Sequence, residues 1–254
     1  MKFASAVALL TANVALVPSV QAQFSFRTDY LPVGHVRTDP ILSQTCLSDH
    51  VHSFYGPQLL RPEVTYEELR ASTPAQNSGN VVENKSLYWH PSVYEVVDGI
   101  YHLVESGDTT AYYIWDEGAR AFPNGFRMIG GMAGQGNNMQ FAGCAGEERC
   151  NKSGNNCNSP DTSFFPDTRC SELEVEMAFP NCWDGRRLTT PNGMDHVSYP
   201  SGDEECPNSH PVRLPRIDLF FRIYDYRGGH YTFSDGSSQF HADYVSGWEE
   251  TELQ

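Results

Sequence analysis

Short runs of β-branched and aromatic residues, separated by Gly, Asn, Asp and Pro, recur through most of this chain. Such runs are typical of β-strands, and seven of them with glycine-rich connections indicate antiparallel pairing. The sequence therefore predicts a mainly β protein, either an antiparallel β-sandwich or a jelly-roll-like fold. The clearest strand candidates are 86–97, 99–104, 110–115, 126–131, 172–179, 215–226 and 230–234.

One short helix and one long loop interrupt this pattern. The segment 61–72, RPEVTYEELRAS, is the helix candidate. Pro62 suits a first helical position, and Thr65 and Glu68 have the spacing of a capping box. The longest connection, 134–170, carries four of the seven cysteines. Loops of this length without internal structure are uncommon, so we expect disulfides to stabilise it.

The first 22 residues have the features of a secretory signal peptide. Lys2 is followed by an apolar run, and Val20 and Ala22 are the small residues expected before a cleavage site. We expect a single secreted domain over 23–254, because β-sandwiches of about 200–250 residues are common as single units. No later stretch approaches the roughly 18 uninterrupted apolar residues of a transmembrane helix. The sequence thus predicts an extracellular or cell-wall protein with no membrane span.

Charge and cysteine content narrow the possible partners. With 17 basic and 32 acidic residues, the surface repels phosphate backbones and anionic lipids, which argues against nucleic acid and membrane surfaces. The seven cysteines suit an oxidising compartment, and their odd number leaves at least one free or intermolecular. Asn84 and Asn151 lie in Asn-Lys-Ser sequons and are the expected glycosylation sites.

The stretch CLSDHVHSFYG, residues 46–56, contains two histidines one residue apart. On a strand, His50 and His52 point to the same face, which is a recurrent way of giving two imidazoles to one metal ion. His196 and His241 each lie near an aspartate and are the candidates to complete the site. Copper suits imidazole ligands outside the cell, and zinc is the alternative. The competing interpretation is that the rings are hydrogen-bonded in polar loops. The acceptors expected to orient the rings are Asp49, Asp195 and Asp243.

An acid/base site without metal is the second possibility. His52 or His196 would act as the base, with Lys85 and Asp184 as further catalytic groups. Asp184 also has a simpler interpretation, because Asp-Gly is a hairpin-turn signal. Aromatic side chains would stack on sugar rings if they were exposed, whereas strand aromatics more simply belong to a core. The candidate substrate-binding residues are Tyr88, Trp89, Arg127 and Trp183.

Seven motifs occur in a characteristic order between Thr38 and Trp248. They are TDPILSQTCLSDHVHSFYG, NKSLYWHPSVY, FPNGFRMIGG, FPNCWDGRRL, DHVSYP, CPNSHPVRLP and FSDGSSQFHADYVSGW. In this order they resemble a family of secreted fungal proteins known as domain of unknown function nineteen ninety-six. The resemblance covers nearly all of the chain that follows the signal peptide.

The resemblance implies an extracellular protein in a cell-wall or polysaccharide context, because members are sometimes fused to carbohydrate-binding WSC modules. It implies no established activity. The chain departs from the family at two places. Gly193 occupies the position of a histidine in the family's D-H-x-S-H motif, which removes a candidate ligand. The segment 71–89 lacks the cysteine element that many members carry before K-S-x-Y-W, which alters the disulfide set.

Two hypotheses from different classes follow. The first is a glycan-cleaving hydrolase or lyase that acts on extracellular or cell-wall polysaccharide through a cleft formed by His50, His52, His196 and His241. The second is a non-catalytic secreted or cell-wall interaction protein, with copper binding as a further alternative. Convergence of the histidine ring nitrogens within about 5 Å favours a metal or catalytic site, since metal ligands lie about 2 Å from the ion.

Overall fold

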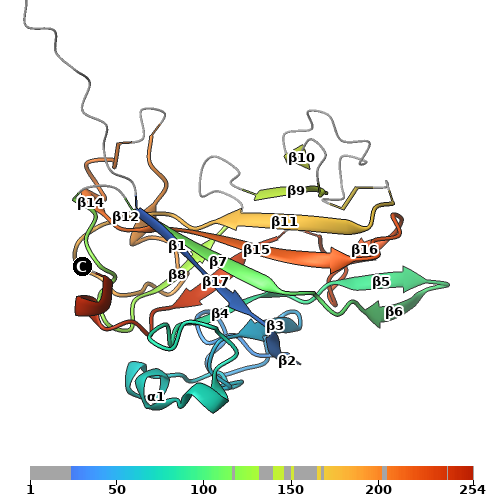
Figure 1. Cartoon of the computed structure of the whole chain (residues 1–254), viewed down its shortest axis with the longest axis horizontal. Helices are drawn as coiled ribbons and strands as arrows, with labels where there is room; N and C mark the ends of the chain where they lie inside the picture. The colour runs from blue at the N-terminus through green and yellow to red at the C-terminus, as the bar shows by residue number, and fades with distance from the viewer. Residues whose placement is uncertain are drawn as a thin grey trace, which may run out of the picture.

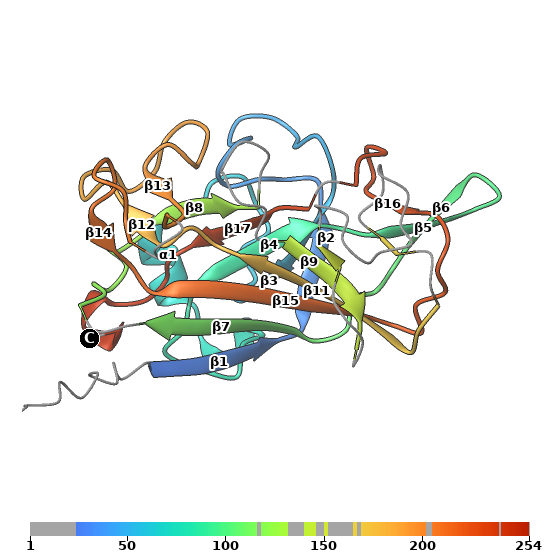
Figure 2. The same cartoon turned by 90° about the horizontal axis from the view of Figure 1, so that it is seen from above.

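In the computed structural model, two antiparallel sheets pack face to face (Figures 1 and 2). The structure describes residues 24–115, 118–131, 140–145, 150, 151, 165, 166, 169–201, 205–238 and 240–253. The larger sheet has six strands in the order β1-β7-β15-β11-β9-β10. These strands are β1 (Phe24–Tyr30), β7 (Thr109–Trp115), β15 (Arg216–Tyr224), β11 (Glu172–Ala178), β9 (Gln140–Cys144) and β10 (Cys150–Asn151).

The second large sheet has five strands in the order β2-β3-β4-β17-β8, and every pair is antiparallel. Strand β17 comes from the C-terminal end of the chain and pairs with β4 and β8. Segments far apart in the sequence therefore lie side by side in this sheet. Its strands are β2 (Pro32–Val36), β3 (His52–Tyr55), β4 (Leu87–Pro91), β17 (Ala242–Val245) and β8 (Arg127–Gly130).

Two small three-stranded sheets complete the described strands. In one of them, β5 and β6 form a hairpin that projects from one end of the molecule (Figure 2). Asp98 and Gly99 both have positive φ at its tip, as a two-residue hairpin turn requires. The strands of these sheets are β13 (Val197–Ser198), β12 (Cys182–Trp183), β14 (Val212–Arg213), β16 (Tyr231–Thr232), β5 (Tyr94–Val97) and β6 (Ile100–Leu103). The structure also has a short 3-10 helix at each of Pro74–Gln76 and Glu250–Leu253.

The main hydrophobic core lies between the two large sheets, because successive side chains on a strand point to opposite faces. Leu219 and Phe221 of β15 are buried in it from one side. Tyr88 of β4 enters from the other side, and its hydroxyl is hydrogen-bonded to that of Tyr113 in β7. The core thus contains aromatic rings with their hydroxyls paired, which avoids the cost of buried unpaired polar atoms.

The opposite face of the five-stranded sheet, called here the outer face, buries a second and smaller apolar cluster. Helix α1 (Tyr66–Ala71) covers this face through Leu69, and the segment 37–50 covers it through Ile41. The outer face is therefore closed to solvent over much of its area, and the candidate site lies beside this cluster. The sheet contributes Phe54 from β3, Leu87 and Trp89 from β4, Ile129 from β8 and Val245 from β17.

The mainly β, antiparallel prediction is confirmed, and the predicted runs correspond to β4, β5, β6, β7, β8, β11, β15 and β16. The run 86–97, predicted as one strand, divides after Pro91 into β4 and β5, which belong to different sheets. Proline has no N–H to donate to a sheet, so it favours a strand end. The segment 134–170, predicted as a loop, contains β9 and β10. The other strands with no counterpart among the predicted runs are β1, β2, β3, β12, β13, β14 and β17.

The predicted helix is confirmed in a shorter form as α1. Thr65 is its N-cap and accepts a hydrogen bond from the Glu68 N–H, while the Glu68 carboxylate accepts one from the Thr65 N–H. This capping box makes Tyr66 the first helical residue, so Pro62 lies before the helix and not at its first position. Within the described ranges, no helix is long and apolar enough to cross a membrane.

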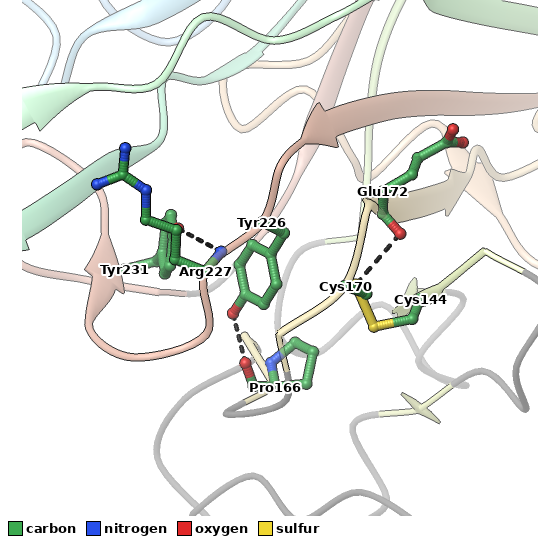
Figure 3. The surroundings of a disulfide bond; sticks show 7 residues. All are labelled: Cys144, Pro166, Cys170, Glu172, Tyr226, Arg227 and Tyr231. Atoms are coloured by element: carbon green, nitrogen blue, oxygen red, sulfur yellow. Dashed lines mark hydrogen bonds between the residues drawn. A yellow bond between two sulfur atoms is a disulfide. The ribbon is translucent and has the colours of Figure 1, made fainter.

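A disulfide between Cys144 and Cys170 connects β9 to the residues just before β11 (Figure 3). The segment around it is held by further hydrogen bonds. The Cys170 N–H donates to the carbonyl of Tyr226 at 3.0 Å, and the Tyr226 hydroxyl donates to the carbonyl of Pro166 at 2.5 Å. The expectation that disulfides stabilise the cysteine-bearing segment is confirmed for this pair.

A second disulfide joins Cys182 in β12 to Cys206. Cys46 is free and exposed, which agrees with the odd cysteine count. The pairing of Cys150 and Cys157 lies outside the described side chains. Disulfides persist in oxidising compartments, so the two described ones fit an extracellular environment.

Candidate metal centre

His50 and His52 lie side by side at the beginning of β3, on the outer face of the five-stranded sheet. His52 is the first residue of the strand and His50 precedes it by two positions, so both rings point to the same face. Their ring centroids are 4.5 Å apart. His52 is almost fully buried, whereas His50 lies closer to the surface. The H-x-H spacing therefore places two imidazoles next to each other.

The register of three neighbouring strands brings His241 to this pair. His52 lies opposite Pro91, and Asp243 lies opposite Trp89. Continuing the β4–β17 register by two residues places His241 opposite Pro91 as well. His52, Pro91 and His241 thus form one row across β3, β4 and the start of β17. The small Pro91 side chain leaves room for the two rings, whose centroids are 5.8 Å apart.

The three rings present nitrogen atoms that all lie within 4.8 Å of one another. The Nε2 atoms of His50 and His241 are 3.3 Å apart. Two ligands that each lie about 2.0–2.1 Å from a tetrahedral zinc ion are about 3.3 Å apart. The spacing of these nitrogens therefore suits an ion bound between the rings, which we call the histidine triad.

The remaining ring nitrogens of His50 and His52 are held by acceptors. The Nδ1 of His52 is 2.9 Å from the carbonyl oxygen of Thr38, so it carries the proton and leaves Nε2 with a lone pair. That Nε2 is buried and has no hydrogen-bond partner. The Nδ1 of His50 is 3.2 Å from a carboxylate oxygen of Asp235. Acceptors of this kind fix the tautomer of metal-binding histidines.

The charges around the triad reflect its burial. Burial lowers the pKa of His52 well below its usual value, and the neighbouring His241 and His50 lower it further. The ring is therefore neutral at neutral pH, as metal binding requires. Burial raises the pKa of Asp243 well above its usual value, and the negative charge of Asp39 adds to the effect. Asp243 Oδ2 is 3.8 Å from the Nε2 of His241.

His196 is not part of the triad. Its Nε2 donates to the carbonyl oxygen of Arg127 at 2.6 Å, and its Nδ1 is 3.3 Å from the hydroxyl of Thr190. Its ring packs against Phe126 with a centroid distance of 5.2 Å. Both nitrogens are therefore occupied by the protein. The structure brings together three of the four candidate histidines and holds the fourth, His196, apart through these hydrogen bonds.

The polar residues proposed for catalysis and substrate binding are also engaged by the protein. Lys85 donates to the carbonyl oxygen of Arg70 at 2.6 Å. Asp184 accepts hydrogen bonds from the backbone of Arg187 and from its side chain, which is the turn arrangement expected from Asp-Gly. Arg127 donates to the carbonyl oxygens of Pro40 and Val64. Lys85 and Arg127 thus hold separate segments of the fold together, and Asp184 holds its own turn.

The aromatic candidates for sugar stacking are buried. Tyr88 and Trp89 have no exposed surface, and Trp183 is 7% exposed. Trp183 donates its indole N–H to the carbonyl oxygen of Arg187. These rings lie in the two apolar clusters, where strand aromatics bury the most surface. They present no open face to a sugar ring.

Asn84 is fully buried, although it lies in a glycosylation sequon. Its Nδ2, the atom to which an N-linked glycan attaches, donates to the hydroxyls of Tyr30, Tyr88 and Thr28 at 2.7, 3.1 and 3.2 Å. A glycan on this atom would require these contacts to break. The side chain of Asn151, the other sequon asparagine, lies outside the described residues.

We predict that Asn84 carries no glycan when the folded protein is secreted from a glycosylating host. Replacing Ser86 by alanine removes the sequon. We expect the intact mass of this variant to differ from that of the wild type only by the one oxygen atom lost in the substitution. Replacing Asn84 by alanine leaves three buried hydroxyls without their donor and should lower the free energy of unfolding by about 1–3 kcal/mol. A mass loss of one glycan in the Ser86→Ala variant would contradict this prediction.

Two acidic residues at the site were not identified from the sequence. The expected acceptors Asp49 and Asp195 do not hold triad rings; the acceptor for His50 is Asp235, which lies 185 positions further along the chain. Asp39 accepts hydrogen bonds from the backbone N–H groups of Ile41 and Leu42 and so shapes the turn that covers the site. Only the Asp-x-Ser spacing of 235–237, which is typical of a turn, gave a local signal.

Gly193, which the family resemblance aligns with a histidine, has no space for a side chain. Its φ is +67°, and a Cβ atom there would lie 2.8 Å from side-chain atoms of Ile129 and Ile41. Its carbonyl oxygen accepts from the Ile129 N–H at 3.0 Å. The glycine therefore allows the 190–194 turn to pack closely on the outer-face cluster.

We predict that the Gly193→Ala substitution lowers the free energy of unfolding by about 1–3 kcal/mol, because it combines an unfavourable φ with steric overlap. Gly99 is a matched control, since its φ is +77° and a Cβ atom added there would meet no atom within 4 Å. Gly99→Ala should cost only the backbone part, about 1 kcal/mol. Urea denaturation measures both, and equal losses in the two variants would contradict the packing argument.

Comparison with known proteins adds one finding. A family model described as a domain of unknown function, DUF1996, matches residues 39–248. No curated protein and no solved structure shows significant similarity to the chain. The matched range includes all three histidines of the triad as well as Asp235 and Asp243.

Proposed function

Since the chain belongs to the DUF1996 family, whose description states no activity, we propose its function from the site: the protein binds a divalent transition metal ion through His50, His52 and His241. The observation that carries this proposal is the convergence of three imidazole nitrogens within 4.8 Å. Zinc and copper are the ions that this all-nitrogen set suits best.

The hydrogen bonds around the triad support this proposal. Thr38 and Asp235 orient His52 and His50 so that one nitrogen of each ring is directed away from its acceptor. The buried Nε2 of His52 has no hydrogen-bond partner in the protein. A buried acceptor without a partner costs about 1–3 kcal/mol. A bound ion would satisfy it and would hold β3 to the segment before β17.

The triad also has the composition of a reactive centre. Three protein ligands leave a coordination position for water or substrate, and a metal ion in such a site supplies Lewis-acid polarisation of a bound oxygen. The His50 side chain is 14% exposed and that of Asp235 is 27% exposed, so solvent reaches the site from this side. His52 and His241 form its buried wall.

We propose an extracellular or cell-wall polysaccharide as the substrate class. The signal-like N-terminus and the two disulfides support an extracellular location. The net charge of −15 favours a neutral polysaccharide over a polyanionic one. Because Tyr88, Trp89 and Trp183 are buried, the substrate would approach from the exposed side of His50 and Asp235.

The test has two readouts on purified wild-type protein. Metal is removed with a chelator and then returned as zinc or copper, and bound metal is measured by elemental analysis. We expect one ion per chain. Turnover is then measured on neutral cell-wall glucans and mannans with and without the metal. Metal-dependent release of oligosaccharides is expected. Stoichiometric binding without turnover of any glycan would leave a non-catalytic metal-binding protein, and no binding would overturn the whole proposal.

A further inference from the structure

Asp243 is a buried carboxylate that the fold leaves without a hydrogen bond. It is fully buried, and both of its oxygens lack a hydrogen-bond partner. Its neighbours across the sheet are Trp89 in β4 and Ile129 in β8, neither of which offers a positive charge. Burying an unpaired ionised carboxylate costs several kcal/mol, so such groups are normally paired, protonated or bound to a metal.

The position of Asp243 directs it toward the triad. It follows His241 by two residues, so both side chains lie on the outer face of the sheet. Within the described part of the chain, its one ion pair is with His241, where Oδ2 and Nε2 are 3.8 Å apart. Ligand atoms of a tetrahedral ion lie about 3.3 Å apart. Asp243 is not one of the residues whose ligand atoms all lie within 4.8 Å of one another, so its side chain must turn toward His50 and His52 to enter ligand range.

We propose that Asp243 is the fourth protein ligand of the metal ion, so that the centre is a three-histidine, one-aspartate site. This inference rests on the proposed metal binding by the triad and specifies its coordination. The carboxylate neutralises one of the two positive charges of the ion, and the ion supplies the partner that the fold does not provide. A water molecule or substrate then enters as a fifth ligand, as zinc sites permit.

The oxygen ligand also determines which ion is preferred. Carboxylate oxygen is a hard donor that suits divalent ions and is a poor ligand for Cu(I). Zinc should therefore remain bound under reducing conditions in which copper is released. Asp39 is the other buried carboxylate near the site, and its Oδ1 already accepts from two backbone N–H groups. Asp243 is the one of the two whose oxygens both lack a hydrogen-bond partner.

The experiment compares Asp243→Asn with a matched control, Asp218→Asn. Asp218 is also a buried aspartate with an unpaired oxygen, but it lies in β15 and pairs with Arg216. Zinc affinity is measured by competition with a chromophoric chelator. The visible spectrum of the cobalt-loaded protein reports the coordination number and ligand type. Unfolding is followed with and without zinc.

We expect Asp243→Asn to weaken zinc binding by more than about 100-fold, because losing an outer-shell partner alone costs about 10- to 100-fold. Its cobalt spectrum should change in intensity and position. Without metal the variant should be about as stable as the wild type, since it replaces a buried carboxyl group that has no hydrogen-bond partner by an amide of the same shape. If it fails to fold, Asp243→Leu serves as the second variant, because the site is lined by Trp89 and Ile129. Asp218→Asn should retain zinc affinity within about threefold.

The inference is overturned if Asp243→Asn binds zinc within threefold of the wild type or retains its cobalt spectrum. In that outcome the triad still binds the ion and the proposed function stands. If the wild type itself binds no metal, the proposed function fails first. If Asp243→Asn is less stable than the wild type in the absence of metal by the same margin as in its presence, Asp243 has a purely structural role, and the inference is also wrong.

Discussion

Replacing His52 by alanine should abolish stoichiometric metal binding. Zinc sites in small domains contribute about 10–16 kcal/mol of binding free energy. If each of the three histidines supplies a comparable share, losing one costs about 3–5 kcal/mol, which is a 10²- to 10⁴-fold loss of affinity. His52 is the most informative position because its ring is buried and its Nε2 has no partner in the protein.

The matched control for this prediction is a histidine outside the triad. His102 is exposed on the β5–β6 hairpin, and His102→Ala should bind zinc as the wild type does. His241→Ala should behave like His52→Ala. Calorimetric titration measures the zinc affinity of the wild type and of the three variants. Circular dichroism checks that each protein is folded. If His102→Ala lost as much zinc affinity as His52→Ala, the triad would not be the metal-binding site.

The second large effect is a loss of folding stability at acidic pH. Burial lowers the pKa of His90 to about 4, and its ring accepts a hydrogen bond from the Tyr55 hydroxyl while stacking on Phe221 at 4.1 Å. In the unfolded chain the pKa of a histidine is about 6.5. Between these values the unfolded state binds a proton that the folded state excludes. Stability is therefore complete above about pH 6.5 and declines as the pH falls toward 4.

A shift of this size corresponds to about 3 kcal/mol in total, of which about 2 kcal/mol is lost between pH 7.5 and pH 5. Burial also lowers the pKa values of His52, His196 and His35, and these shifts act in the same direction. Urea denaturation of the metal-free protein over this pH range measures the decline. His90→Gln should flatten the profile by about 2 kcal/mol at pH 5. If the stability of His90→Gln fell with pH in parallel with that of the wild type, the pH dependence would come from groups other than His90.

The antiparallel β-fold and two of the three histidines of the triad could be predicted from the sequence because their signals are local. Strand composition and the Thr65 capping box depend on residues close together in the chain. The H-x-H spacing alone places His50 and His52 on one face of a strand. These interpretations required no knowledge of which strands pair.

The rest of the site depends on long-range pairing that no local pattern encodes. His196 and His241 both lie next to an aspartate in similar short motifs, and the sequence ranks them equally. They differ because β17 pairs with β4, which places His241 in the row of His52, whereas His196 is held by the Arg127 carbonyl oxygen. The role of Asp235 arises in the same way, since its partner His50 lies in a distant part of the chain.

Anomalous diffraction at the zinc absorption edge tests the central claim most directly. Crystals of the wild-type protein grown with zinc are measured just above and just below the edge, and the difference locates the ion directly. We predict one strong peak about 2 Å from ring nitrogens of His50, His52 and His241. A zinc-saturated protein with no peak between these three rings, or with its peak at other side chains, would contradict the account.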